Sequence, residues 1–67
     1  MPDLTVNGDQ RHFEGDLTVA QLIERLGLGG KAVAVEVNKE LVPKRQHVQT
    51  ALANGDRVEV VTLVGGG

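Results

Sequence analysis

Residues 17–27 read LTVAQLIERLG and carry the pattern of one amphipathic helix. Thr18 and Gln21 have the spacing of a capping box, in which a hydroxyl and an amide satisfy N–H groups of the first helical turn. Apolar residues recur at i, i+3, i+4 and i+7 and form one face, Val19, Leu22, Ile23 and Leu26. Gly27 stands where a glycine commonly ends a helix. The pattern therefore predicts a helix of about two to three turns.

Segments with strand-like alternation lie on both sides of this helix. The expected strands are residues 3–7, 10–14, 32–37, 40–42 and 57–63. The expected turns are Asn7-Gly8 or Gly8-Asp9, then Asn38-Lys39 and Asn54-Gly55-Asp56. Residues 44–53 lack a clear period and predict a loop with a helical turn. This order of elements predicts an α+β domain over residues 1–63, followed by a flexible glycine tail over residues 64–67.

One helix can cover only one face of a sheet, so the other face must meet water or a partner. In the last strand, Val58 and Val60 share a face with Thr62, whereas Val61 and Leu63 share the opposite face with Arg57 and Glu59. Apolar side chains on an uncovered face would form a docking surface beside the tail. Alternatively, Val61 and Leu63 complete a central strand that is buried on both sides. The sequence leaves both interpretations open.

Composition excludes several classes of function. The chain has 67 residues, no cysteine and a formal net charge of -2, with Phe13 as its one aromatic residue. It therefore offers neither a thiol nucleophile nor the basic and aromatic surfaces that bind nucleic acids. His12 and His47 lack metal-ligand spacing, so we expect both on the surface and no bound metal. Because no segment reads as a membrane span or a signal peptide, we expect a cytoplasmic protein.

The tail directly follows the last strand and reads Val64-Gly65-Gly66-Gly67. Glycines cannot pack and lose much backbone entropy on ordering, so they form a thin thread that can enter the narrow active site of another protein. Gly65 and Gly66 are predicted to keep the thread thin, and Gly67 carries the carboxylate that would react. The alternative is that the glycines are a frayed end or a spacer.

With these pieces in order, the chain resembles the ThiS family, the small ubiquitin-like sulfur carriers of bacterial thiamine biosynthesis. The resemblance spans essentially the whole chain and is carried by Val6-Asn7-Gly8, Leu17-Thr18-Val19, residues 33–43, residues 52–61 and Val64-Gly65-Gly66-Gly67. The chain has three terminal glycines where the minimal family pattern needs two. Some family members share this feature, so Gly67 remains the expected reactive terminus.

The resemblance implies a β-grasp fold, with a mixed sheet of four to five strands, the first and last strands parallel at its centre, and the helix across one face. It also implies a carrier that is not itself an enzyme. An adenylating partner would activate Gly67 with ATP and magnesium, and a persulfide-bearing donor would convert the adenylate to a thiocarboxylate. A thiazole synthase would then receive the sulfur. We expect Val61, Leu63 and Val64 to dock on these partners.

Three other readings compete with this one. The small subunit of molybdopterin synthase has a similar fold and terminus, but tends to be longer. A ubiquitin-like modifier or tRNA-thiolation carrier would share the activation step, and a modifier would form isopeptide conjugates with lysines. From a different class, a β-grasp binding module would do no chemistry and would tolerate an extension of its C-terminus.

Overall fold

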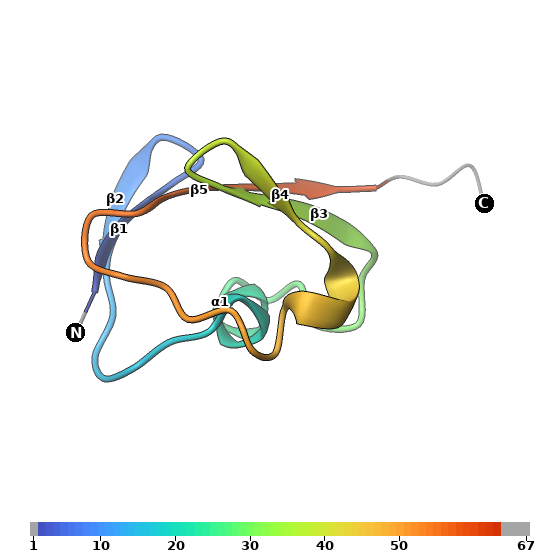
Figure 1. Ribbon diagram of the computed structural model, residues 1–67, viewed down its shortest axis with the longest axis horizontal. Helices are drawn as coiled ribbons and strands as arrows, with labels where there is room; N and C mark the ends of the chain where they lie inside the picture. The colour runs from blue at the N-terminus through green and yellow to red at the C-terminus, as the bar shows by residue number, and fades with distance from the viewer. Residues whose placement is uncertain (1, 64–67) are drawn as a thin grey trace.

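The computed structural model describes residues 2–63, which form one mixed sheet with an α-helix across one of its faces (Figure 1). The strands are β1 (Asp3–Val6), β2 (Asp9–His12), β3 (Val33–Val37), β4 (Glu40–Val42) and β5 (Arg57–Thr62). The helix is α1 (Val19–Arg25), and a 3₁₀ turn spans Lys44–Gln46. The predicted α+β order is confirmed, including the helical turn in the loop after β4.

The sheet has the strand order β2-β1-β5-β3-β4. The first and last strands are neighbours and run parallel, with Thr5 opposite Arg57 and Val6 opposite Val58. The other pairs are antiparallel. This is the β-grasp arrangement that the resemblance implied, and it makes β5 the central strand.

Helix α1 begins and ends as the sequence predicted. The Thr18 hydroxyl accepts a hydrogen bond from the Gln21 N–H at 3.2 Å, and the Gln21 amide oxygen accepts one from the Thr18 N–H at 2.9 Å. At the other end, Gly27 has φ +76° and its N–H donates to the carbonyl of Glu24. The Leu28 N–H donates to the Ile23 carbonyl at 3.0 Å, which completes a Schellman motif.

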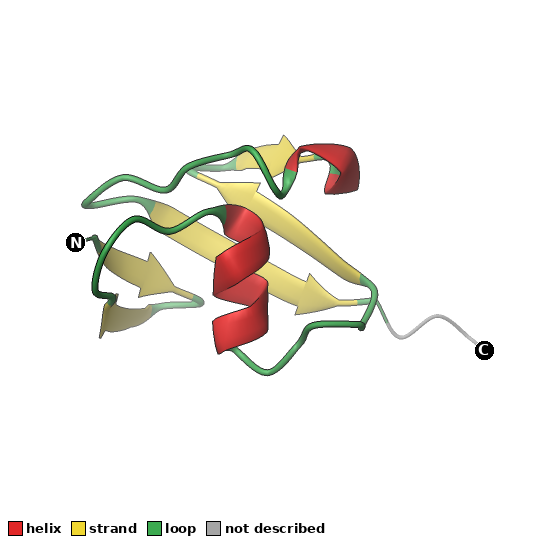
Figure 2. Cartoon of the chain, turned by 90° about the horizontal axis from the view of Figure 1, so that it is seen from below, coloured by secondary structure: helices red, strands yellow, loops and turns green. Residues whose placement is uncertain are grey.

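The hydrophobic core lies between α1 and the face of the sheet that α1 crosses (Figure 2). Its side chains are almost fully excluded from water: Leu4, Val6, Phe13, Leu17, Val19, Leu22, Ile23, Val35, Leu52, Val58 and Val60. Phe13 is the predicted anchor, although β2 ends one residue before it. The valines come from alternate positions of the strands, because side chains alternate between the two faces of a sheet.

Both hairpins use two-residue turns in which both residues have positive φ. Asn7 and Gly8 connect β1 to β2 with φ angles of 50° and 87°, and Asn38 and Lys39 connect β3 to β4 with 52° and 71°. Such type I′ turns match the twist of the strands, and asparagine tolerates their first position. No helix in the described part of the chain is long and apolar enough to cross a membrane.

Candidate functional site

The candidate site is built on β5, which exchanges hydrogen bonds with β3 on one side and with β1 on the other. The Leu63 N–H donates to the Ala32 carbonyl at 2.9 Å, so the backbone N–H and C=O groups of the odd-numbered residues point toward β3. The Asn7 N–H donates to the Val58 carbonyl at 2.9 Å, so the backbone N–H and C=O groups of the even-numbered residues point toward β1. This two-sided pairing fixes the orientation of the strand that leads to the predicted tail.

Alternate side chains of β5 lie on opposite faces of the sheet. Val58 and Val60 are buried under the helix, whereas Val61 and Leu63 have exposed fractions of 57% and 55%. Their exposure rules out the alternative in which these two residues complete a strand buried on both sides. The sequence prediction that one face of β5 cannot lie under the helix is confirmed.

A third large apolar side chain lies on the same helix-free face, which we call the open face. Leu41 has an exposed fraction of 65% and pairs with Glu36, which in turn pairs with Glu59. Residues directly opposite each other in a sheet project to the same side. The sequence pattern does not place Leu41 on this face, because only the register of β4 against β3 determines which face it occupies.

The open face changes character along β5. Near the start of β5, Glu36, Lys39, Arg57 and Glu59 line a shallow hollow of about 330 Å³. Glu36 and Glu59 lie directly opposite each other, and like charges in that position are destabilising. Farther along, Val61 pairs with Ala34, and the surface becomes apolar. The predicted grouping of Arg57, Glu59, Val61 and Leu63 on one face is confirmed, and this face passes from charged to apolar along β5.

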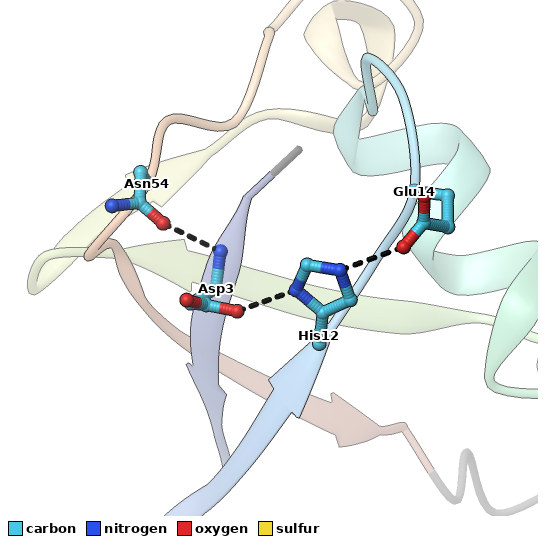
Figure 3. A network of polar contacts seen from close by, with 4 residues as sticks. All are labelled: Asp3, His12, Glu14 and Asn54. Carbon is cyan, nitrogen blue, oxygen red and sulfur yellow. Dashed lines mark hydrogen bonds and ion pairs between the residues drawn. The ribbon is translucent and has the colours of Figure 1, made fainter.

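A polar cluster lies at the other end of the molecule, beside the first residue of β1 (Figure 3). His12 Nδ1 lies 2.6 Å from Asp3 Oδ1, and its Nε2 lies 2.8 Å from Glu14 Oε2. These hydrogen bonds, first to Asp3 and then to Glu14, raise the pKa of His12 above its ordinary value. The cluster is on the surface, as predicted for His12, and is remote from Leu63.

The prediction for His47 is wrong, because this residue has an exposed fraction of only 6%. Its Nε2 lies 3.1 Å from the Val42 carbonyl and donates to it, and its own carbonyl accepts from the Ala20 N–H. The 3₁₀ turn carries the ring inward, so His47 connects the turn with β4 and α1. Within residues 2–63, no group of three or more His, Asp or Glu side chains is arranged to hold a metal ion.

Val64, Gly65, Gly66 and Gly67 lie outside the described residues, so their predicted roles in docking, threading and reaction stay predictions. Leu63 is the last described residue and directly precedes them in sequence. Of the predicted site residues, the structure therefore brings Val61 and Leu63 together on the open face.

Comparison with known proteins gives a consistent result. The model of the ThiS family matches residues 4–67. The sulfur carrier protein ThiS of Bacillus subtilis is 35% identical over 65 residues, which cover 96% of this chain and 98% of that protein. A thiazole synthase of Paramagnetospirillum magneticum is 44% identical over 64 residues. The chain spans only about one fifth of that protein, since the match covers 20% of its length.

Among solved structures, the crystal structure of the thiamine biosynthesis protein ThiS from Geobacter metallireducens is similar to this chain with a TM-score of 0.81. The two sequences are 34% identical, and the match covers 97% of this chain and 99% of that one. The agreement extends over the whole sheet and the helix, which supports the β-grasp assignment.

Proposed function

The chain belongs to the ThiS family of sulfur carriers, and from this we propose that the carboxylate of Gly67 is adenylated, converted to a thiocarboxylate and used as a sulfur donor in thiazole formation. The observation that carries the proposal is the position of two exposed apolar side chains, Val61 and Leu63, on the central strand immediately before Val64-Gly65-Gly66-Gly67. A partner that holds this face would have the glycines within reach of its own active site.

Activation is needed because a carboxylate is a poor electrophile. Its negative charge repels nucleophiles, and oxide is a poor leaving group. In the proposed first step, an oxygen of the Gly67 carboxylate attacks the α-phosphorus of ATP. The bond from this phosphorus to the oxygen that bridges it to the β-phosphate breaks, and pyrophosphate leaves with that oxygen. The product is an acyl-adenylate. We assign ATP and magnesium to the adenylating partner, because this sequence has no glycine-rich loop that opens a helix.

Sulfur transfer would then proceed by attack on the acyl carbon. The terminal sulfur of a partner's persulfide forms a bond to this carbon, AMP leaves, and an acyl disulfide results. A second thiol of the partner attacks the disulfide sulfur that belongs to the partner, which releases the thiocarboxylate on Gly67 and leaves a disulfide in the partner. The chain itself holds no cysteine, so both sulfur-exchange groups must come from partners.

Thiazole synthase is the recipient that we propose. A thiazole synthase that contains a segment 44% identical to this chain supports this destination over molybdopterin synthesis. The match to a ThiS carrier over 98% of that protein's length points the same way. Gly65 and Gly66 would keep the thread thin where it enters the partner.

Intact-protein mass spectrometry tests the proposal. The chain is purified from its native cells and, separately, incubated with ATP, magnesium, a matched activating enzyme and a persulfide donor. We expect a species heavier by one exchange of oxygen for sulfur, localised to Gly67 by fragmentation. A free carboxylate as the only species after full reconstitution would overturn the sulfur-carrier mechanism and favour a binding module.

A substitution in the tail tests the threading role separately. Gly66→Val widens the thread and restricts its backbone, so we expect adenylation by the activating enzyme to fall at least about tenfold, the effect of about 1.4 kcal/mol in the transition state. Circular dichroism and the melting temperature should match those of the unmodified chain. Full turnover of this variant would contradict the threading role, and Gly66→Ala provides a smaller, graded change.

A further inference from the structure

The pairing between β1 and β5 stops before β5 does. β1 pairs with β5 at Thr5 and Val6, and the chain then leaves the sheet through the Asn7-Gly8 turn. β5 continues past Val58 to Thr62. The backbone of Val60 faces the β1 side, where no residue of β1 remains to pair with it.

The side chain of Asn7 occupies the vacant place. The Val60 N–H donates to Asn7 Oδ1 at 2.8 Å, and Asn7 Nδ2 donates to the Val60 carbonyl at 3.1 Å. Both bonds are partly buried, and both have good donor–acceptor distances. The side-chain amide thus takes the place of one more peptide group of β1. As a result, β5 is hydrogen-bonded on both sides as far as Val60.

A type I′ turn alone does not require this arrangement. The turn requires only that its first residue tolerate a positive φ, and asparagine and glycine both do so. Asn38 is the internal comparison, because it has φ 52° in an equivalent turn on the other side of β5. Its Oδ1 accepts from the Arg57 N–H at 3.0 Å, at the start of β5 and far from Leu63. Two asparagines therefore hold β5 from opposite sides, and only Asn7 holds the end that carries Val61 and Leu63.

We propose that Asn7 is a positioning residue, whose side-chain amide fixes the end of β5 and thereby holds Val61 and Leu63 in place for the activating enzyme. The inference rests on the proposed function of Gly67. Without the amide, the end of β5 is held from the β3 side alone, and the partner must order it on binding. Ordering a segment on binding weakens association and leaves the chemistry of the bound state unchanged.

The test compares Asn7→Gly with Asn38→Gly. Glycine keeps the positive φ that each turn requires and removes only the amide, so the two variants are matched in chemistry. Adenylation is followed as a function of carrier concentration, at a temperature where circular dichroism shows both variants folded. We expect Asn7→Gly to raise KM about tenfold with kcat within about twofold, and Asn38→Gly to leave both constants within about twofold.

Amide hydrogen exchange shows whether the hydrogen bonds of each asparagine side chain to β5 have been removed. Exchange at Val60 should quicken in Asn7→Gly, and exchange at Arg57 should quicken in Asn38→Gly. If Asn7→Gly does not fold, Asn7→Asp serves instead, since it keeps the acceptor for the Val60 N–H and loses the donor to the carbonyl. Its KM should then exceed that of the unmodified chain, and an equal KM would overturn the positioning role.

The outcomes separate this inference from the function on which it rests. Failure of the unmodified chain to be adenylated overturns the proposed function. Adenylation of the unmodified chain with equal KM values for the Asn7→Gly and Asn38→Gly variants overturns the positioning role alone. A purely structural role for Asn7 would lower the melting temperature of Asn7→Gly and leave its KM equal to that of Asn38→Gly.

Discussion

At the scale of single residues, His12 shows how an exposed side chain acquires a preferred charge. Two carboxylates, Asp3 and Glu14, accept hydrogen bonds from opposite nitrogens of its ring and raise its pKa in the folded state. The charged form of His12 is therefore favoured by folding. Because the cluster lies in water, salt screens its ionic component.

This raised pKa predicts a pH dependence of stability. The stabilisation from His12 is fully present below its unfolded pKa of about 6.5 and is lost as pH rises through the higher folded pKa. We expect the melting temperature to fall as the pH rises above 6.5, and we expect this part of the pH dependence to be absent in His12→Gln. Scanning calorimetry at several pH values in low salt measures it. Identical pH profiles for the two proteins would show that the cluster does not form in solution.

For two residues, Asn7 and His47, the sequence did not predict the contacts that their side chains make. Asn7 was predicted as a turn residue from its glycine neighbour, and this local property is confirmed. Its amide bonds to Val60 depend on a strand distant in sequence, so no local pattern contains them. His47 was placed on the surface because polar residues usually lie there, but the Val42 carbonyl satisfies its ring nitrogen and allows burial.

At the scale of an element, α1 was predictable from start to end because its signals are all local. The capping box, the apolar face and the C-terminal glycine lie within residues 17–27 and depend on spacing along one helix. The faces of β5 were also predicted from alternation. The face on which Leu41 lies was not predicted, because the orientation of the short strand β4 depends on its register against β3.

The capping box provides a prediction for α1. Thr18→Ala removes the acceptor for the Gln21 N–H, so we expect it to destabilise the fold by about 1 kcal/mol, which lowers the melting temperature of a domain of this size by roughly 4–8 °C. Thr18→Ser keeps the hydroxyl and should recover most of the loss. Equal melting temperatures for Thr18→Ala and the unmodified chain would contradict a stabilising cap.

At the scale of the whole molecule, the structure has two layers, with the helix on one face of the sheet and the open face bare within the described residues (Figure 1). The α+β class followed from the order of the elements, and the uncovered face followed because one helix cannot cover both faces of a sheet. The pairing of β1 with β5 came from the family resemblance, because long-range pairing leaves no periodic signal in the sequence.

This asymmetry predicts that fold and docking can be separated by mutation. Leu63→Glu alters the open face and should leave the melting temperature nearly unchanged while raising KM for the activating enzyme. Val60→Ala, on the buried face of the same strand, should instead cost about 1–3 kcal/mol of stability. Thermal melts and adenylation kinetics on both variants provide the check. Loss of native circular dichroism in Leu63→Glu would assign this side chain to the core.

The central position of β5 also governs the timing of folding during synthesis. Among the described strands, the β1–β2 and β3–β4 hairpins meet only through β5, which occupies the middle of the sheet and is made after the other four. An isolated hairpin is marginally stable in water, so the sheet closes only after the ribosome has released Arg57–Thr62. The strand that completes the fold also carries Val61 on the open face. A chain in which Arg57–Thr62 has not yet joined the sheet consequently lacks the assembled open face.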